Sequence, residues 1–156
     1  MREYVIDKTA RGFVNTMSKM GREVRTELER LMNSVSERTF DSILTNSPVD
    51  EGNYMASNRM ASGAERTDTF GGDFGGKKKS IARREAAHLY AIQASFDFNW
   101  KLGDGSVWFS NNIDYADAVE DGGPRWTITR PYKVYDNAER KMENEFIPEE
   151  VAKAGL

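Results

Sequence analysis

The sequence predicts an α+β protein in which a long N-terminal helix packs on an antiparallel β-sheet, with further short helices and a C-terminal helix. Apolar residues recur every three or four positions from residue 13 to residue 44, which is the spacing of one helix face. Residues 94–102 instead alternate apolar and polar side chains, as a strand with one buried face does. The chain has 156 residues, 38% hydrophobic and 30% charged, so we expect one domain over 1–156.

The first half of the chain predicts a helix, a turn and a loop. The stripe over 13–44 fits a core-facing helix better than a coiled-coil seam, because its spacing drifts and Thr39 interrupts it. Pro48 ends this helix, and Gly52 helps the chain to turn. Residues 54–64 are ambiguous between strand and loop. The glycine-rich segment within residues 65–79 predicts a long, exposed and flexible loop.

The second half predicts a helix over 80–93 and then a β-hairpin over 94–111. The alternating residues would form its first strand, Gly103 to Gly105 its turn, and residues 107–109 its second strand. A short helix over 115–120 is expected to end at Gly122. Residues 126–129 could form another strand, followed by a helix over 134–146 and a short last helix after Pro148.

The composition disfavours catalysis. The chain has no cysteine and one histidine, which removes thiolate nucleophiles and disulfides as well as most metal and triad chemistry. We therefore expect no enzyme activity, no cofactor and no bound metal. No apolar run reaches the ~18 residues of a membrane span, and the N-terminus does not resemble a signal peptide, so folding in a cytoplasm is expected.

Charged residues are unevenly distributed, although the net charge is only −3. Residues 77–84 contain only basic charges, and residues 104–121 contain only acidic ones. Two interpretations stay open: both segments are solvated surfaces, or they are complementary faces of neighbouring subunits in a head-to-tail ring. In the second case the candidate contact residues are Lys77, Lys78, Lys79, Arg83 and Arg84, with Asp114, Asp117, Glu120 and Asp121.

Two nucleotide or metal motifs are present only in part. Gly71, Gly76 and Lys77 match three positions of a phosphate-binding loop, but Lys78 stands where a magnesium-binding hydroxyl is required. The acidic residues of 114–121 have helical spacing and could attract a divalent cation, yet the calcium-loop pattern is absent. A flexible loop and a solvated helix are the expected structures.

Two hydrolytic interpretations are also weak. A metal-dependent nuclease would need Asp50 with Glu139 and Lys141, but in a helix the last two point about 200° apart. His88 has no cysteine and no spaced histidine as a partner, so we expect a surface or half-buried histidine.

Three sequence blocks, in order and over roughly 10–146, resemble a known family. The first, residues 47–57, contains Pro48, Asp50 and Gly52 and is similar to a family pattern T-P-V-D-T-G after a long helix, with Glu51 and Tyr54 as departures. The second, residues 111–122, follows N-x-x-x-Y-A-x-x-x-E-x-G through Asn111, Tyr115, Ala116, Glu120 and Gly122. The third is the proline-containing segment 124–131 before a helix with Ala138. The family is that of bacteriophage neck or tail-completion proteins, akin to minor tail components of lambdoid phages.

The resemblance implies a long helix against an antiparallel sheet, and a non-catalytic virion protein at the joint between capsid and tail. Its expected partners are copies of itself, in a ring on the order of six or twelve copies, and the head–tail connector and tail tube or terminator proteins. DNA would pass through the lumen without sequence-specific binding. A tail terminator and a DNA-handling assembly protein are the alternatives. In this interpretation residues 70–79, the basic residues and residues 114–121 make the contacts, Pro48 and Gly52 turn the chain, Tyr115 and Ala116 pack a short helix, and Glu120 faces outward.

Overall fold

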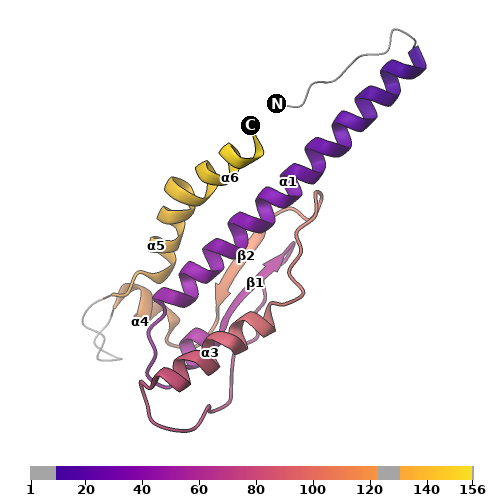
Figure 1. Ribbon diagram of the computed structural model, residues 1–156. Helices are drawn as coiled ribbons and strands as arrows, with labels where there is room; N and C mark the ends of the chain where they lie inside the picture. The colour runs from indigo at the N-terminus through magenta and orange to yellow at the C-terminus, as the bar shows by residue number, and fades with distance from the viewer. Residues whose placement is uncertain (1–9, 123–130, 156) are drawn as a thin grey trace.

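The long helix α1 (Ala10–Asn46) is the axis of the fold. The computed structural model describes residues 10–122 and 131–155, with side chains from residue 18 onward. Figure 1 shows the C-terminal helices alongside one side of α1, and the strands and α3 on the other. The predicted α+β class and the predicted long helix are confirmed.

The sheet has two antiparallel strands, β1 (Asn58–Ser62) and β2 (Val107–Asn111). Met60 is opposite Phe109, and Ser62 is opposite Val107. A single-turn helix, α2 (Asn53–Ala56), precedes β1, so the ambiguous segment 54–64 contains both a helix and a strand.

The predicted β-hairpin over 94–111 is wrong. Helix α3 (Ile81–Ala94) ends where the hairpin was expected to begin, and the chain then turns at residues 95–97. Beyond the turn, backbone groups bond to α1 instead of to a strand: the Trp100 N–H donates to Asn33 Oδ1 at 2.8 Å, and the Leu102 N–H donates to Glu29 at 3.0 Å. The partner of β2 is therefore β1, and the paired residues of the two strands are 45 or more positions apart in the sequence.

Three apolar clusters of the described residues attach α1 to other elements, and the third of them joins Leu31 and Val35 to Phe146 of the C-terminal helices. The first lies between α1, β1 and α3, and its buried members are Phe40, Leu44, Met55, Ala56, Met60, Ala87 and Ala91. The second joins α1 to α4 (Ala116–Asp121) and α5 (Val134–Lys141), and its buried members are Ile43, Tyr54, Val119, Val134 and Ala138. Ile43 and Leu44 thus face different clusters from neighbouring positions of one helix.

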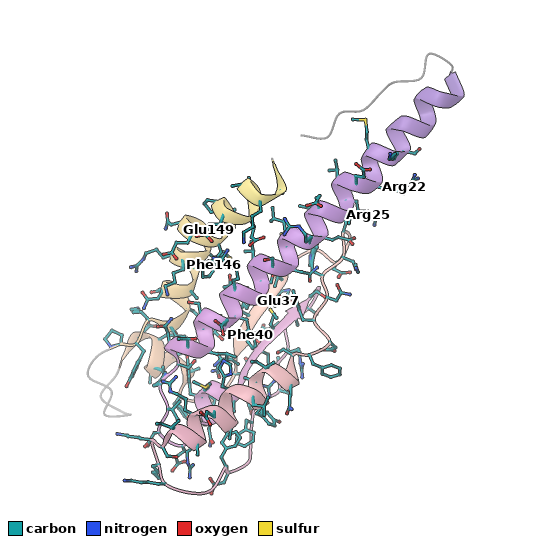
Figure 2. The ribbon with its side chains drawn as sticks, in the orientation of Figure 1. Arg22, Arg25, Glu37, Phe40, Phe146 and Glu149 are labelled. Atoms are coloured by element: carbon teal, nitrogen blue, oxygen red, sulfur yellow. The ribbon has the colours of Figure 1, made fainter. Side chains whose placement is uncertain are left out.

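The C-terminal helices form one nearly continuous helical stretch along α1. After α5 come a π-helical segment (Met142–Phe146) and α6 (Ile147–Ala154). The π segment directly precedes Pro148, which has no N–H to give to a regular helical bond. Arg38 of α1 stacks its guanidinium over the Phe146 ring at 4.4 Å and also bonds to Glu149 at 2.6 Å. Figure 2 shows Phe146 and Glu149 on the helical stretch beside α1. Helices near 134–146 and after Pro148 are confirmed, whereas the expected strand over 126–129 lies outside the described residues.

Residues 65–79 contain no helix or strand, and most of their side chains are exposed. Three of them are partly buried, Arg66, Phe70 and Phe74, and the two aromatic rings stack at 4.4 Å and pack against the first apolar cluster. Asp68 accepts hydrogen bonds from buried Arg59 at 2.8 Å and from Arg66 at 3.0 Å. The loop is therefore attached to the body by its aromatic residues and by ion pairs; its flexibility stays a prediction.

Candidate interface surfaces

The first two sequence blocks meet in space around Asn58, a fully buried polar residue. Its amide nitrogen donates to the carbonyl oxygens of Tyr54 and Met55, each at 3.1 Å. Its amide oxygen accepts from Asn111 at 3.2 Å and from the Tyr135 hydroxyl at 2.8 Å. Because buried polar groups are costly unless they are bonded, this network specifies how the strands and α5 fit together.

Glu120 does not face outward as predicted. It is partly buried, and one carboxylate oxygen accepts hydrogen bonds from the Tyr54 hydroxyl at 3.3 Å and from the Tyr135 N–H at 3.0 Å. Burial, together with the nearby Glu120 charge, raises the pKa of both tyrosines well above the usual range, so both hydroxyls stay protonated donors. Glu120 thus stabilises the packing of α4 against Tyr54 and α5, with only part of its side chain accessible.

A broad groove of about 790 Å³ shares Tyr54 with this network. The first block supplies Pro48, Asp50 and Gly52 to its wall, and the second block supplies Tyr115. Lys79 and Arg84 line the same groove. Residues that sequence analysis had assigned separately to turns and to charged contacts are therefore brought together at one concave surface.

The basic residues separate into exposed and buried ones. Lys77, Lys78 and Lys79 are exposed, and Lys78 pairs with Glu51. Arg83 is buried: its guanidinium donates to the carbonyl oxygens of Glu51 at 3.0 Å and Gly76 at 2.8 Å and pairs with Asp73. Arg83 consequently holds the loop onto α3 and has little surface to offer a neighbouring subunit.

The acidic residues are mostly exposed. Asp114, Asp117 and Asp121 are solvent-accessible, and Asp121 accepts a 2.7 Å bond from Lys133. Figure 1 places α4, the start of α3 and the loop before it at the same end of the molecule. The positive and negative segments are therefore neighbours within one chain, and they do not form the two opposite ends that their separation in sequence indicated.

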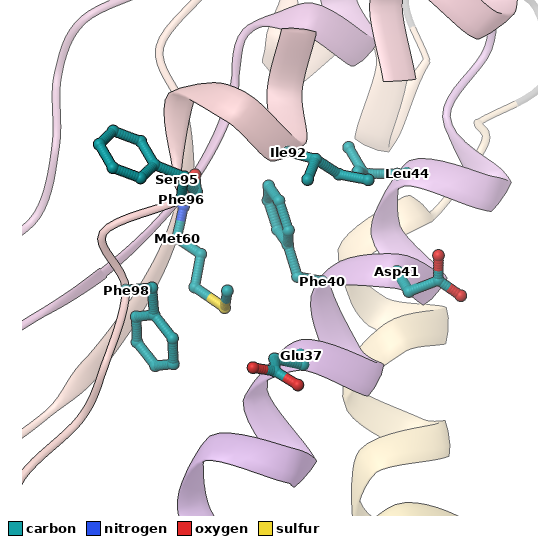
Figure 3. A pocket seen from close by; sticks show the side chains of 9 residues that line it. All are labelled: Glu37, Phe40, Asp41, Leu44, Met60, Ile92, Ser95, Phe96 and Phe98. Carbon is teal, nitrogen blue, oxygen red and sulfur yellow. Dashed lines mark hydrogen bonds between the residues drawn. The ribbon is translucent and has the colours of Figure 1, made fainter. Parts of the chain in front are cut away.

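A second, smaller groove lies between α1 and α3 and has a volume of about 300 Å³. Figure 3 shows Phe40 and Leu44 of α1 across from Ile92 of α3, with Met60, Phe96 and Phe98 beside them. Glu37 and Asp41 stand at its edge on α1. The sequence did not predict this surface, because Phe96 and Phe98 were assigned to a strand. The feature that could have indicated it is the spacing of the apolar residues Leu89, Ile92 and Phe96, which are three and four positions apart.

The residues considered for chemistry are scattered. Within the described ranges, no three histidine, cysteine, aspartate or glutamate side chains gather as metal ligands would. His88 is half-buried, and its Nε2 lies 3.7 Å from Asp41. Asp50 belongs to the turn after α1, whereas Glu139 and Lys141 are exposed on α5. In the same described part of the chain, no helix is both long and apolar enough to cross a membrane.

The chain matches no family model, no curated protein and no solved structure. A function must therefore be argued from the geometry and from the resemblance of the sequence blocks.

Proposed function

We propose that the protein is a structural component of a tailed-phage virion that forms a ring at the head–tail joint, between the head connector and the tail. The observation that carries this proposal is that the first two blocks meet at the Asn58 network and that both supply residues to the lining of one open groove. The motif residues form one shared surface and no catalytic site among the described residues. This arrangement suits a protein that acts by binding other proteins.

The exposed lysines next to this groove supply the candidate charged contacts. Lys77 to Lys79 are exposed beside Asp50 and Glu51, in a loop whose attachments involve Arg59 and Arg83. A surface with both charge signs favours specific partners and a fixed register over general adhesion. We assign the contacts to Lys77, Lys78, Lys79, Asp114 and Asp117, with connector, terminator or tube proteins and copies of this chain as partners.

A native mass spectrum across a concentration series tests the ring directly. We expect a closed species on the order of six or twelve subunits. A monomer at every concentration, both alone and after addition of a purified connector, would contradict the proposal. A stable dimer that never grows would contradict it as well, because two copies cannot surround a channel.

Charge reversal tests the surface assignment. Lys77→Glu, Lys78→Glu and Lys79→Glu together should reduce particle assembly in a complementation assay, whereas Lys141→Glu, at an exposed position of α5, should leave assembly unchanged. Unchanged assembly after the triple reversal would remove these lysines from the interface.

A DNA-handling role is the alternative that the same lysines could support. Phosphate contacts strengthen at low salt, so a gel shift at low ionic strength discriminates the two. We expect no shift; a shift that disappears as salt is raised, and also with the triple reversal, would favour the alternative.

A further inference from the structure

The first part of α1 projects beyond the rest of the molecule. Figure 1 shows α1 continuing past the ends of the strands and of α6. Bonds from α1 side chains to distant parts of the chain involve Arg25, which donates to the Leu102 carbonyl at 3.2 Å, and Glu29 and Asn33 beyond it. Val24, one residue before Arg25, is 61% exposed although it is apolar.

The sequence of this projecting part has the pattern of a helix that docks in a groove. Apolar residues occupy positions 13, 17, 20 and 24, which are the i, i+4, i+7 and i+11 anchors of one helix face. Over residues 10–25 there are four basic residues and one acidic residue. Figure 2 shows Arg22 and Arg25 on this part and Glu37 and Phe40 farther along the same helix.

The groove between α1 and α3 has the complementary character. Phe96 and Ile92 on its α3 side are 84% and 44% exposed, which is unusual for large apolar side chains beside a formed groove. Phe40 and Met60 form its buried floor. Both charged residues that line it, Glu37 and Asp41, are acidic and exposed.

We propose that this groove binds the projecting N-terminal part of α1 from a second copy of the chain. The apolar anchors of the incoming helix would cover Ile92 and Phe96, and Lys19, at the flank of this apolar face, would lie beside Glu37 and Asp41. The inference deepens the proposed function and rests on it, because it names the contact that joins neighbouring subunits of the ring.

The two surfaces are different, so the contact is heterologous. Each copy offers one helix and one groove, and a third copy can always bind to a pair. Such a contact closes into a ring when the rotation between neighbours allows it. An isologous contact through Phe96 alone would instead stop at a dimer.

Cysteine cross-linking tests the contact, because the chain has no cysteine of its own. Met20→Cys and Phe96→Cys are made in separate proteins and mixed under mild oxidation, so that every cross-link joins two copies. Ser18→Cys is the matched control: it is exposed on the same helix but points about 200° away from Met20. We expect a disulfide-linked heterodimer from the first pair, and at least about fivefold less from Ser18→Cys with Phe96→Cys.

A charge exchange tests the same contact without oxidation. Glu37→Lys with Asp41→Lys should weaken self-association by more than about tenfold, and Lys19→Glu should also weaken it. All three changes in one chain should restore association, since the charges on both sides of the contact are then reversed. Circular dichroism checks that each variant is folded, and failure of the combined variant to recover overturns the proposal.

The outcomes separate this inference from the proposed function. A closed ring in the native mass spectrum, with no more cross-linking from Met20→Cys than from Ser18→Cys, overturns the helix-in-groove contact and leaves the ring intact. Cross-linking of Phe96→Cys chiefly with itself overturns the contact in favour of an isologous dimer. A monomer at every concentration without any cross-link overturns both proposals.

Discussion

The Tyr135 hydroxyl donates a 2.8 Å hydrogen bond to the buried amide oxygen of Asn58, which joins α5 to β1 across 77 residues of chain. Asn58 is also bonded to α2 and to Asn111 of β2. A single side chain therefore ties together both strands and a helix from the far end of the sequence.

The first prediction concerns this bond. Tyr135→Phe should lower the free energy of unfolding by about 1–2 kcal/mol, because the amide oxygen loses one of its two donors inside the protein. Tyr132→Phe is the control, at a side chain that is 50% exposed, and should change stability by less than about 0.5 kcal/mol. Urea unfolding measures both; equal effects would mean that the hydroxyl contributes nothing specific.

Helices were predictable because their apolar residues repeat within one element. The spacing over 13–44 and 80–93 places α1 and α3 to within a few residues, since α1 is Ala10–Asn46 and α3 is Ile81–Ala94. Burial follows the stripe in α1 from Leu31 onward, whereas on α3 the apolar Ile81 and Leu89 are exposed and Arg83 is buried.

Strand β1 could not be recognised, because two of its three buried residues, Asn58 and Arg59, are polar. They are stabilised by hydrogen bonds to residues outside the strand, such as Asn111 and Asp68. Hydropathy therefore shows no alternation at β1. In contrast, the alternation over 94–102 is misleading: Phe96 is 84% exposed, and Trp100 is held by Asn33.

The candidate contacts were predicted only as charges along the sequence. Burial of Arg83 and Glu120 depends on partners from other elements, namely the Gly76 carbonyl and the Tyr54 hydroxyl. Sequence spacing does not reveal those partners, so charged residues that stabilise the fold could not be distinguished from charged residues exposed at the surface.

A second prediction concerns the turn after α1. Gly52 has φ of +94°, and an added Cβ would lie 3.0 Å from the Phe74 ring and 3.1 Å from Ala87 Cβ. Gly52→Ala should therefore destabilise the protein by about 2–3 kcal/mol through both backbone strain and the clash. Gly103→Ala separates the two causes, because Gly103 also has positive φ, of +112°, but open space around its Cβ position. Thermal unfolding should show a clearly smaller loss for Gly103→Ala.

A third prediction concerns the loop 65–79. Arg83→Lys removes the planar fork that reaches the Glu51 and Gly76 carbonyls, and a lysine cannot reproduce both bonds. Trypsin should then cleave at residues 77–79 at least about fivefold faster, because cleavage requires local detachment of the loop. Arg84→Lys is the matched control on the same helix, since Arg84 is exposed and makes only long bonds of 3.3 and 3.4 Å. Equal cleavage of the two variants would show that Arg83 does not hold the loop.

The last prediction concerns acid stability and Glu150, which is 2% exposed on α6 and lies against α1. Its carboxylate bonds to Lys153 at 2.8 Å and to Arg30 at 3.1 Å, and Arg38 is 3.4 Å away. The hydrogen bond from Lys153, together with those from Arg30 and Ser34, lowers the pKa of Glu150 from 4.5 to about 2, against the rise that burial alone would cause.

A carboxylate whose pKa is lower in the folded state stabilises the fold above its unfolded pKa, and this stability is lost as the pH falls toward its folded pKa. For Glu150 that window runs from about pH 4.5 down to about 2. Glu150→Gln should cost about 2 kcal/mol at pH 7, because Arg30 and Lys153 lose their charged partner. Between those pH values, the stability of the variant should fall by less than that of the unmodified protein.

Glu149→Gln is the control, because it removes a carboxylate that is 55% exposed; it should cost less than about 1 kcal/mol at pH 7. Urea unfolding at several pH values measures the difference, and parallel pH profiles for the unmodified protein and Glu150→Gln would show that this buried cluster does not control acid stability.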